Sequence, residues 1–198
     1  GGAYGHVSIQ GDPIHEDDPQ VIIDEGRLNA GLGPNITLKI PTTAAGLAAM
    51  ETLMEEGHKI NATEIMSISQ ALDVCDVHEG VKKRTGSAPK LYLSHITGIY
   101  DEYLKRVVAE QHVDISPDVL WQAGLAVARK LYAIMQERAL PATFIGGGAR
   151  GLQHFTEMVG GDVVVTINWV GTADALVDQN PPVVFRLFNP VEQYVIDE

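Results

Sequence analysis

Residues 35–67, NITLKIPTTAAGLAAMETLMEEGHKINATEIMS, carry the pattern of a strand, a helix and a second strand. The residues from Ile36 to Ile40 are mostly apolar or β-branched, which favours a buried strand. Pro41 ends that strand because proline has no N–H group to donate to a ladder. The second strand runs from Ile60 to about Met66. A helical connection between them predicts two adjacent, parallel strands.

The helix between the two strands has its own start and stop signals. Thr42 or Thr43 can cap it with a hydroxyl group, and Gly57 can end it because glycine readily adopts the left-handed conformation of a helix end. Apolar residues at helical spacing give it one buried face; they are Leu47, Met50, Leu53 and Met54. The stretch therefore predicts one complete strand–helix–strand unit.

Lys39 is the polar residue at the end of the first strand, and Asn61 and Thr63 lie two apart on the second, so both point to the same side. A lysine amine in an apolar setting can attack a carbonyl and form a Schiff base. Asn61 and Thr63 could then hold substrate oxygens or a water molecule. Spacing alone favours the simpler interpretation, a strand-end lysine that reaches solvent.

The segments LKIPTT (38–43) and AGLAAMETLMEEGHKINATEIMSISQAL (45–72) resemble the transaldolase family, including its small fructose-6-phosphate aldolase members. Those enzymes are (β/α)8 barrels whose Schiff-base lysine lies in a K-[IVL]-[PA]-x-T segment. An N-x-T strand and a helix beginning S-x-x-Q-A follow it. The resemblance implies that Lys39 is the Schiff-base lysine and that Asn61 and Thr63 belong to the same site.

Gln10 stands at a second position that the resemblance makes functional. The segment VSIQGDP resembles the family pattern V-S-x-E-V-D, in which the glutamate assists acid–base chemistry through an ordered water. Asp12 matches the aspartate, whereas Gln10 replaces the glutamate. An amide can position water but cannot take its proton. The aldolase members of the family also carry glutamine here, so we expect Gln10 to act in catalysis.

Two further segments concern a substrate phosphate. Residues 91–104, LYLSHITGIYDEYL, resemble the family pattern S-P-F-V-G-R-I-x-D-W; Ser94 fits, but Ile99 replaces the phosphate-binding arginine. The run GGGAR matches M-G-A-S-F-R, so Arg150 keeps the phosphate-binding arginine while Gly148 has lost the serine hydroxyl. A glycine run after a strand can cradle phosphate or simply form a turn. The resemblance implies a substrate-binding group of Asn61, Ser94, Gly148 and Arg150.

Strand-like segments alternate with helical ones along the chain, which predicts a parallel sheet covered by helices. The six strands begin near Tyr4, Ile36, Ile60, Lys90, Ala142 and Val163. The resemblance implies the third to eighth strands of a (β/α)8 TIM barrel, which has eight strands. We therefore expect residues 1–198 to form a single, partial TIM-barrel domain. We also expect the chain to be incomplete and inactive by itself.

Composition excludes several other classes. The chain has 198 residues, 45% of them apolar, as in a packed α/β enzyme. Its net charge of −12 argues against nucleic-acid binding. The basic run 82–84 is expected to lie in a solvated loop that follows a helix over 69–77. No apolar run approaches the about 20 residues of a membrane span, and no signal peptide is visible, so a cytoplasmic protein is expected.

Two isolated features favour structural roles. His15-Glu16-Asp17-Asp18 could suggest a metal site, but Asp18 followed by Pro19 is typical of a helix start, and no second ligand cluster accompanies it. Cys75, the only cysteine, falls within an apolar helical pattern and is expected to be a buried thiol. No metal site is therefore predicted.

The resemblance implies transfer of a dihydroxyacetone unit between sugar phosphates through Lys39, as in the pentose phosphate pathway, without metal or nucleotide cofactor. Thr63 and Gln10 would position water, Asn61 would hold hydroxyl groups, and Arg150 would bind phosphate. Two alternatives remain: a catalytically weak sugar-phosphate-binding homologue, or an aldolase acting on a less phosphorylated ketose. The family implies a homo-oligomer that binds neither nucleic acid nor membrane.

Overall fold

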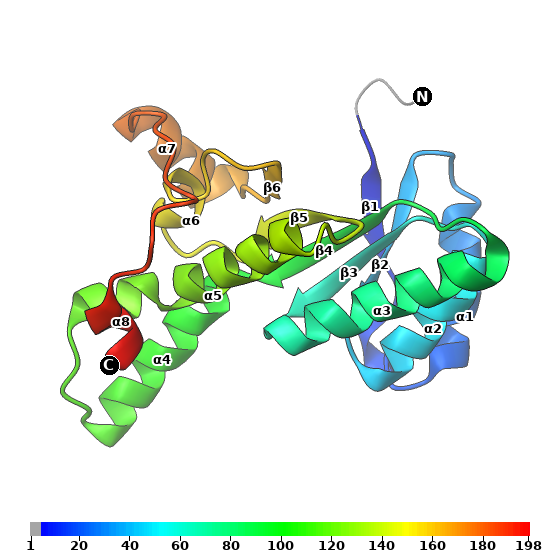
Figure 1. The fold of residues 1–198 in the computed structure, drawn as a ribbon, viewed down its shortest axis with the longest axis horizontal. Coiled ribbons are helices and arrows are strands. Elements are labelled where there is room, and N and C mark those ends of the chain that lie inside the picture. The colour runs from blue at the N-terminus through cyan, green and yellow to red at the C-terminus, as the bar shows by residue number, and fades with distance from the viewer. Residues whose placement is uncertain (1–4) are drawn as a thin grey trace. The chain divides into compact units, whose positions relative to one another are not determined.

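The computed structural model describes residues 5–198 (Figure 1). Six strands form one sheet in chain order, and β1–β2, β2–β3 and β5–β6 pair in parallel. The strands are β1 (Val7–Gln10), β2 (Ile36–Pro41), β3 (Ile60–Ile65), β4 (Leu91–Ile96), β5 (Ala142–Gly147) and β6 (Val163–Val165). Tyr4, where the first strand was expected to begin, lies outside the described residues. The alternation of strands and helices confirms the α/β class of a partial TIM barrel.

The chain divides into two compact units that share β4 and β5. The first unit comprises residues 1–94 and 140–143, and the second unit residues 95–139 and 144–198. The first therefore contains the lysine strand and its neighbours, while the second contains the glycine-rich loop after β5.

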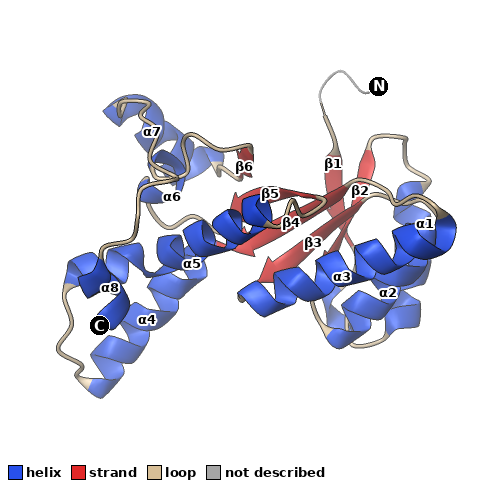
Figure 2. Ribbon diagram, viewed as in Figure 1, coloured by secondary structure: helices blue, strands red, loops and turns tan. Residues whose placement is uncertain are grey.

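Three helices cover one face of β1–β3 in the first unit (Figures 1 and 2). They are α1 (Pro19–Ala30), α2 (Ala44–Glu55) and α3 (Ile68–Thr85), and a short 3-10 turn, η2 (Pro13–His15), precedes α1. Alternate strand residues such as Leu38 and Ile40 are buried, as are Met50 and Leu53 of α2. Because side chains alternate along a strand, this apolar layer leaves the polar strand residues on the opposite face.

The helix starts follow the expected capping chemistry. Asp18 caps α1 by accepting the N–H of Gln20. Of the two threonines considered, Thr43 caps α2, its hydroxyl accepting the N–H of Gly46 at 3.0 Å. Each cap satisfies a backbone donor that has no partner within the helix.

The basic run 82–84 was expected to lie in a loop, but it forms part of the last turn of α3. Positive charge at a helix C-terminus interacts favourably with the helix dipole. Arg84 also pairs with Glu51 and Glu55 of α2, at 2.5 and 2.8 Å. Gly86, with φ of 84°, then ends the helix. The prediction was wrong because a polar surface helix has a weak apolar pattern.

The second unit is built mainly on two long helices that lie side by side, α4 (Thr97–Gln111) and α5 (Pro117–Glu137) (Figure 1). Sequence patterns did not predict α4, whose buried residues are Thr97, Gly98 and Asp101 rather than an apolar stripe. Shorter elements follow: α6 (Gln153–Thr156), the π-helical turn η3 (Trp169–Ala173), α7 (Asp174–Gln179) and α8 (Gln193–Asp197).

Three properties of the described residues bear on function. Cys75 is buried, as expected, and its burial raises the pKa of the thiol to about 11. Within residues 5–198, no helix combines the length and apolar character needed to cross a membrane. Nor does any group of three His, Cys, Asp or Glu side chains in that range gather as metal ligands would.

Candidate functional site

The polar face of the sheet in the first unit carries a row of three predicted site residues. Gln10 of β1 pairs in register with Lys39 of β2, and Lys39 with Asn61 of β3. The strand neighbours of Lys39, Leu38 and Ile40, are only 2% and 3% exposed on the helix-covered face. Lys39 therefore lies on the polar face, half-buried between an amide on either side.

Asn61 is held by hydrogen bonds from both sides. Its amide donates to Ser8 Oγ at 3.0 Å, and its Oδ1 accepts from Ser94 Oγ at 2.7 Å. Asn61 and Ser94 are each 5% exposed, so these bonds fix the amide orientation. An amide has two donors and two acceptor lone pairs, and one of each remains for a ligand. Ser8 was not predicted; its position two residues before Gln10 is the signal that could have found it.

Thr63 lies in the second half of β3, two residues before the strand ends at Ile65. Its carbonyl accepts two hydrogen bonds from Thr42, one from the backbone N–H and one from the hydroxyl, both at 2.9 Å. Glu64, directly after it, has φ of 58°, in the left-handed region that non-glycine residues rarely adopt. Thr42, which directly follows β2, thus links the Lys39 strand to the Thr63 strand.

Gln70, at the start of α3, forms hydrogen bonds with the segment that follows β3 and with Thr42. Its Oε1 accepts the N–H groups of Met66 and Ser67, and its amide donates to the carbonyl of Thr42 at 3.0 Å. Together with Ser67 it forms a capping box. Gln70 belongs to the quoted S-x-x-Q-A motif, but its link to Thr42 was not predicted.

The side-chain amide of Gln10 donates a hydrogen bond to Glu16 Oε1 at 2.8 Å. A carboxylate thus adjoins the position where the family pattern has glutamate. A small cavity of about 20 Å³, enough for one water molecule, is lined by Gln10, Glu16 and Lys39, and also by Leu38, Ile40 and residues of α1 from the helix-covered face. Sequence reasoning considered Glu16 only as part of a metal cluster, because no motif marks a residue that reaches the site from a loop.

In the second unit, Gly148 and Arg150 lie in the loop after β5. Gly148 has φ of 63°, and a Cβ placed there would lie 2.7 Å from Ile96 Cγ2. Serine in this backbone conformation would be strained and would clash with Ile96. Arg150 donates from Nε to Glu102 Oε2 at 2.6 Å and from Nη1 to the Gly148 carbonyl at 2.9 Å.

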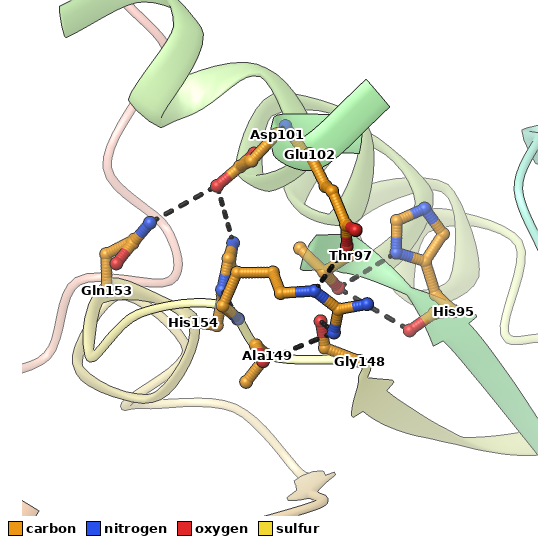
Figure 3. A network of polar contacts seen from close by, with 10 residues as sticks. His95, Thr97, Asp101, Glu102, Gly148, Ala149, Gln153 and His154 are labelled. Carbon is orange, nitrogen blue, oxygen red and sulfur yellow. Dashed lines mark hydrogen bonds and ion pairs between the residues drawn. The ribbon is translucent and has the colours of Figure 1, made fainter. Parts of the chain in front are cut away.

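A buried polar cluster anchors this loop (Figure 3). His154 Nδ1 accepts the backbone N–H of Arg150 at 2.9 Å, so the proton of the neutral ring lies on Nε2. Nε2 lies 3.1 Å from Asp101 Oδ2, close but not aligned as a hydrogen bond. Gln153 donates to the same oxygen at 3.2 Å. Asp101 and His154 are 53 residues apart, and no sequence pattern linked them.

His95 is a second buried histidine of this unit. Its Nδ1 lies 3.0 Å from Thr97 Oγ1, and its ring stacks between Tyr100 and Phe144. Burial lowers the pKa of His95 to about 4, so the ring is neutral at physiological pH.

Comparison with known proteins places this chain in a family. The family model for transaldolase/fructose-6-phosphate aldolase matches residues 2–189, nearly the whole chain. The chain belongs to this family. The match confirms the resemblance drawn from Lys39 and its surrounding motifs, and with it the TIM-barrel fold class.

Individual family members are similar over most of this chain. A probable transaldolase of Thermus thermophilus is 30% identical over 148 residues, covering 74% of this chain and 54% of the relative. The transaldolase of Neisseria meningitidis is 27% identical, over 76% of this chain and 43% of the relative. The transaldolase of Mycobacterium tuberculosis is 30% identical, over 69% of this chain and 39% of the relative. The chain thus spans about half the length of these curated relatives, or less.

Within this transaldolase-family chain, the structure brings five predicted residues together in the first unit: Gln10, Lys39, Asn61, Thr63 and Ser94. Gly148 and Arg150 lie in the second unit. The roles assigned to all seven remain predictions. Ser8, Glu16 and Thr42 form hydrogen bonds with members of this group. Gln70 in turn bonds the carbonyl of Thr42.

Proposed function

We propose that the protein transfers a dihydroxyacetone unit between sugar phosphates through a Schiff base on Lys39, as in the pentose phosphate pathway. The observation that carries the proposal is the row Gln10–Lys39–Asn61 on the polar face of the sheet. In this row the half-buried amine of Lys39 has the uncharged amides of Gln10 and Asn61 as its neighbours on the adjacent strands.

The amine of Lys39 attacks the ketose carbonyl, and the resulting carbinolamine loses water to form an imine. Breaking the bond between the third and fourth carbons of fructose 6-phosphate then releases glyceraldehyde 3-phosphate. The electron pair of that bond passes into the imine, which leaves an enamine of dihydroxyacetone on Lys39. Attack of this enamine on an aldose acceptor, followed by hydrolysis, completes the transfer.

The surrounding residues have separate roles in this proposal. Asn61, oriented by Ser8 and Ser94, holds hydroxyl groups of the bound sugar. Thr63 and Gln10 position the water that carries protons, and Glu16 accepts the proton that the Gln10 amide cannot take. Arg150 binds a substrate phosphate.

A second candidate is an aldolase for a less phosphorylated ketose. It is favoured by Ile99, which offers no charge, and by Glu102, which pairs with Arg150 at 2.6 Å. A catalytically weak sugar-phosphate-binding homologue is the further alternative. For each, the resemblance implies a cytoplasmic homo-oligomer.

The test is to measure glyceraldehyde 3-phosphate released from fructose 6-phosphate, with and without an aldose acceptor. The transfer reaction predicts release that depends on the acceptor, whereas an aldolase releases the product without one. Release from neither mixture, by a folded protein, would contradict the transfer reaction. The second candidate then predicts glyceraldehyde released from fructose, and no release from fructose either would favour the binding homologue.

A further inference from the structure

A separate hollow lies in the second unit, between α5 and residues 187–196. It has a volume of about 570 Å³, within the range of cavities that bind small molecules. Its lining on α5 comes from Ala126, Arg129, Lys130 and Ala133, whose spacing places them on one face of the helix. None of the residues proposed to act with Lys39 lines it.

The wall opposite α5 is mostly apolar and is fixed by backbone hydrogen bonds. The N–H groups of Arg186 and Leu187 both donate to the Val159 carbonyl, at 2.9 and 3.0 Å. Phe188 and the buried Tyr132 line the hollow with rings whose centres lie 5.9 Å apart. Phe188 is nevertheless 66% exposed. Its ring therefore offers a face on which an aromatic ligand can pack.

Arg129 brings an incompletely compensated positive charge to this hollow. Its Nη2 donates to Glu157 Oε2 at 2.6 Å and to the Arg186 carbonyl at 3.1 Å. The other oxygen of Glu157 accepts from Arg186 Nη1 at 3.0 Å. Within residues 5–198, no other carboxylate lies at ion-pair distance from either arginine. Two guanidinium groups thus share one carboxylate, and the group of three keeps one net positive charge.

The burial of this group makes the missing negative charge costly. The side chains of Arg129 and Glu157 are only 10% and 14% exposed. Arg129 Nε is buried and has no hydrogen-bond partner among the described residues. A buried donor without a partner and a buried charge without compensation both cost free energy. Among the described residues that line the hollow, none is acidic, so an anionic ligand meets no repulsion there.

We propose that this hollow binds a small aromatic carboxylate. The carboxylate pairs with Arg129, and the aromatic body packs against Phe188 and the apolar wall. A carboxylate matches the single net positive charge of the buried group better than a phosphoryl dianion does. The apolar wall likewise suits an aromatic body better than a sugar, whose hydroxyl groups require hydrogen-bond partners. This inference goes beyond the proposed function and does not depend on it.

The experiment is a ligand-observed NMR titration with 2-naphthylacetate and with 2-naphthylacetamide, an uncharged molecule of nearly the same shape. We expect wild-type protein to bind the acid with a Kd on the order of 1 mM or tighter. The amide should bind about tenfold more weakly, because it cannot form a charge-assisted pair with a guanidinium group. Absence of binding by the acid, or equal binding of acid and amide, would overturn the inference.

A tryptophan substitution locates the bound probe. Ala133→Trp fills the hollow from the exposed face of α5 and should abolish binding of both probes. Ala109→Trp, at an exposed position of α4 outside the hollow, is the matched control and should bind as the wild type does. If the two tryptophan variants bound the acid equally well, the probe would lie elsewhere and the inference would fail.

Arg129→Gln tests the charge and leaves Glu157 paired with Arg186. The variant should bind the acid no better than the amide, whereas Arg138→Gln, at an exposed arginine directly after α5, should keep the preference. A preference retained by folded Arg129→Gln would contradict the assignment. Circular dichroism verifies folding, and the tryptophan pair decides the question should Arg129→Gln not fold. Titration requires no turnover, so a failure of Schiff-base chemistry at Lys39 is detected separately.

Discussion

In the proposed mechanism, Glu16 supplies the proton acceptor that Gln10 lacks. Gln10 cannot accept a proton, but its amide binds the Glu16 carboxylate at 2.8 Å beside a water-sized cavity. We predict that Glu16→Gln lowers the turnover number for fructose 6-phosphate about 100-fold, a typical contribution of general acid–base catalysis. Steady-state kinetics measures it.

Asp17→Asn, at the exposed neighbouring position, is the matched control and should retain normal turnover. Equal turnover in Glu16→Gln and the wild type would show that the carboxylate only orients Gln10.

The burial of His95 predicts how the free energy of unfolding depends on pH. Burial lowers the pKa of His95 from 6.5 to about 4. Between these pH values the unfolded chain binds a proton that the folded chain does not, so stability falls as the pH drops from 6.5 to 4. The full difference amounts to about 3 kcal/mol.

Because phenylalanine cannot be protonated, His95→Phe should lose this contribution to the pH dependence. The measurement is urea unfolding at several pH values. An unchanged slope between pH 6.5 and 4 in the variant would contradict the assignment to His95. His112→Asn, at an exposed position, is the control and should keep the slope.

Among the helices, α3 is connected to the site strands through Gln70 and Thr42. Gln70 satisfies two backbone N–H groups at the start of α3 and bonds the carbonyl of Thr42. We predict that Gln70→Ala lowers the free energy of unfolding by about 2 kcal/mol, since a helix cap and a further hydrogen bond are lost. Denaturant unfolding measures this change.

The control is Asp73→Ala, an exposed substitution on the same helix, which should change stability by less than about 0.5 kcal/mol. If both variants lost the same stability, the bonds of Gln70 would contribute nothing beyond helix propensity.

Physical reasons explain why some helices and strands could be predicted from the sequence and others could not. β2, α2 and β3 were predictable because strand composition, capping residues and apolar spacing agree over one short stretch. α4 was not, because its buried positions hold Thr97, Gly98 and Asp101. The length of α3 was underestimated because its last turn is basic and solvent-facing.

At the scale of the whole molecule, the α/β class followed from alternating patterns and the family from local motifs. Motifs also singled out Lys39, Asn61 and Arg150, whose roles stay predictions. They could not identify contacts made by residues distant in sequence, such as Ser8 with Asn61, Asp101 with His154, or Glu102 with Arg150. Such contacts depend on how strands and helices pack, which no local pattern specifies.

The central claim, covalent catalysis by Lys39, is tested most directly by trapping. The protein is incubated with fructose 6-phosphate, reduced with borohydride, digested and mapped by mass spectrometry. We predict a stable three- or six-carbon adduct on the peptide that contains Lys39. The adduct should be absent from Lys39→Ala and retained in Lys59→Ala, a lysine of the same unit that bonds the Pro34 carbonyl. A folded protein that forms no adduct at Lys39, with either fructose 6-phosphate or dihydroxyacetone, would contradict it.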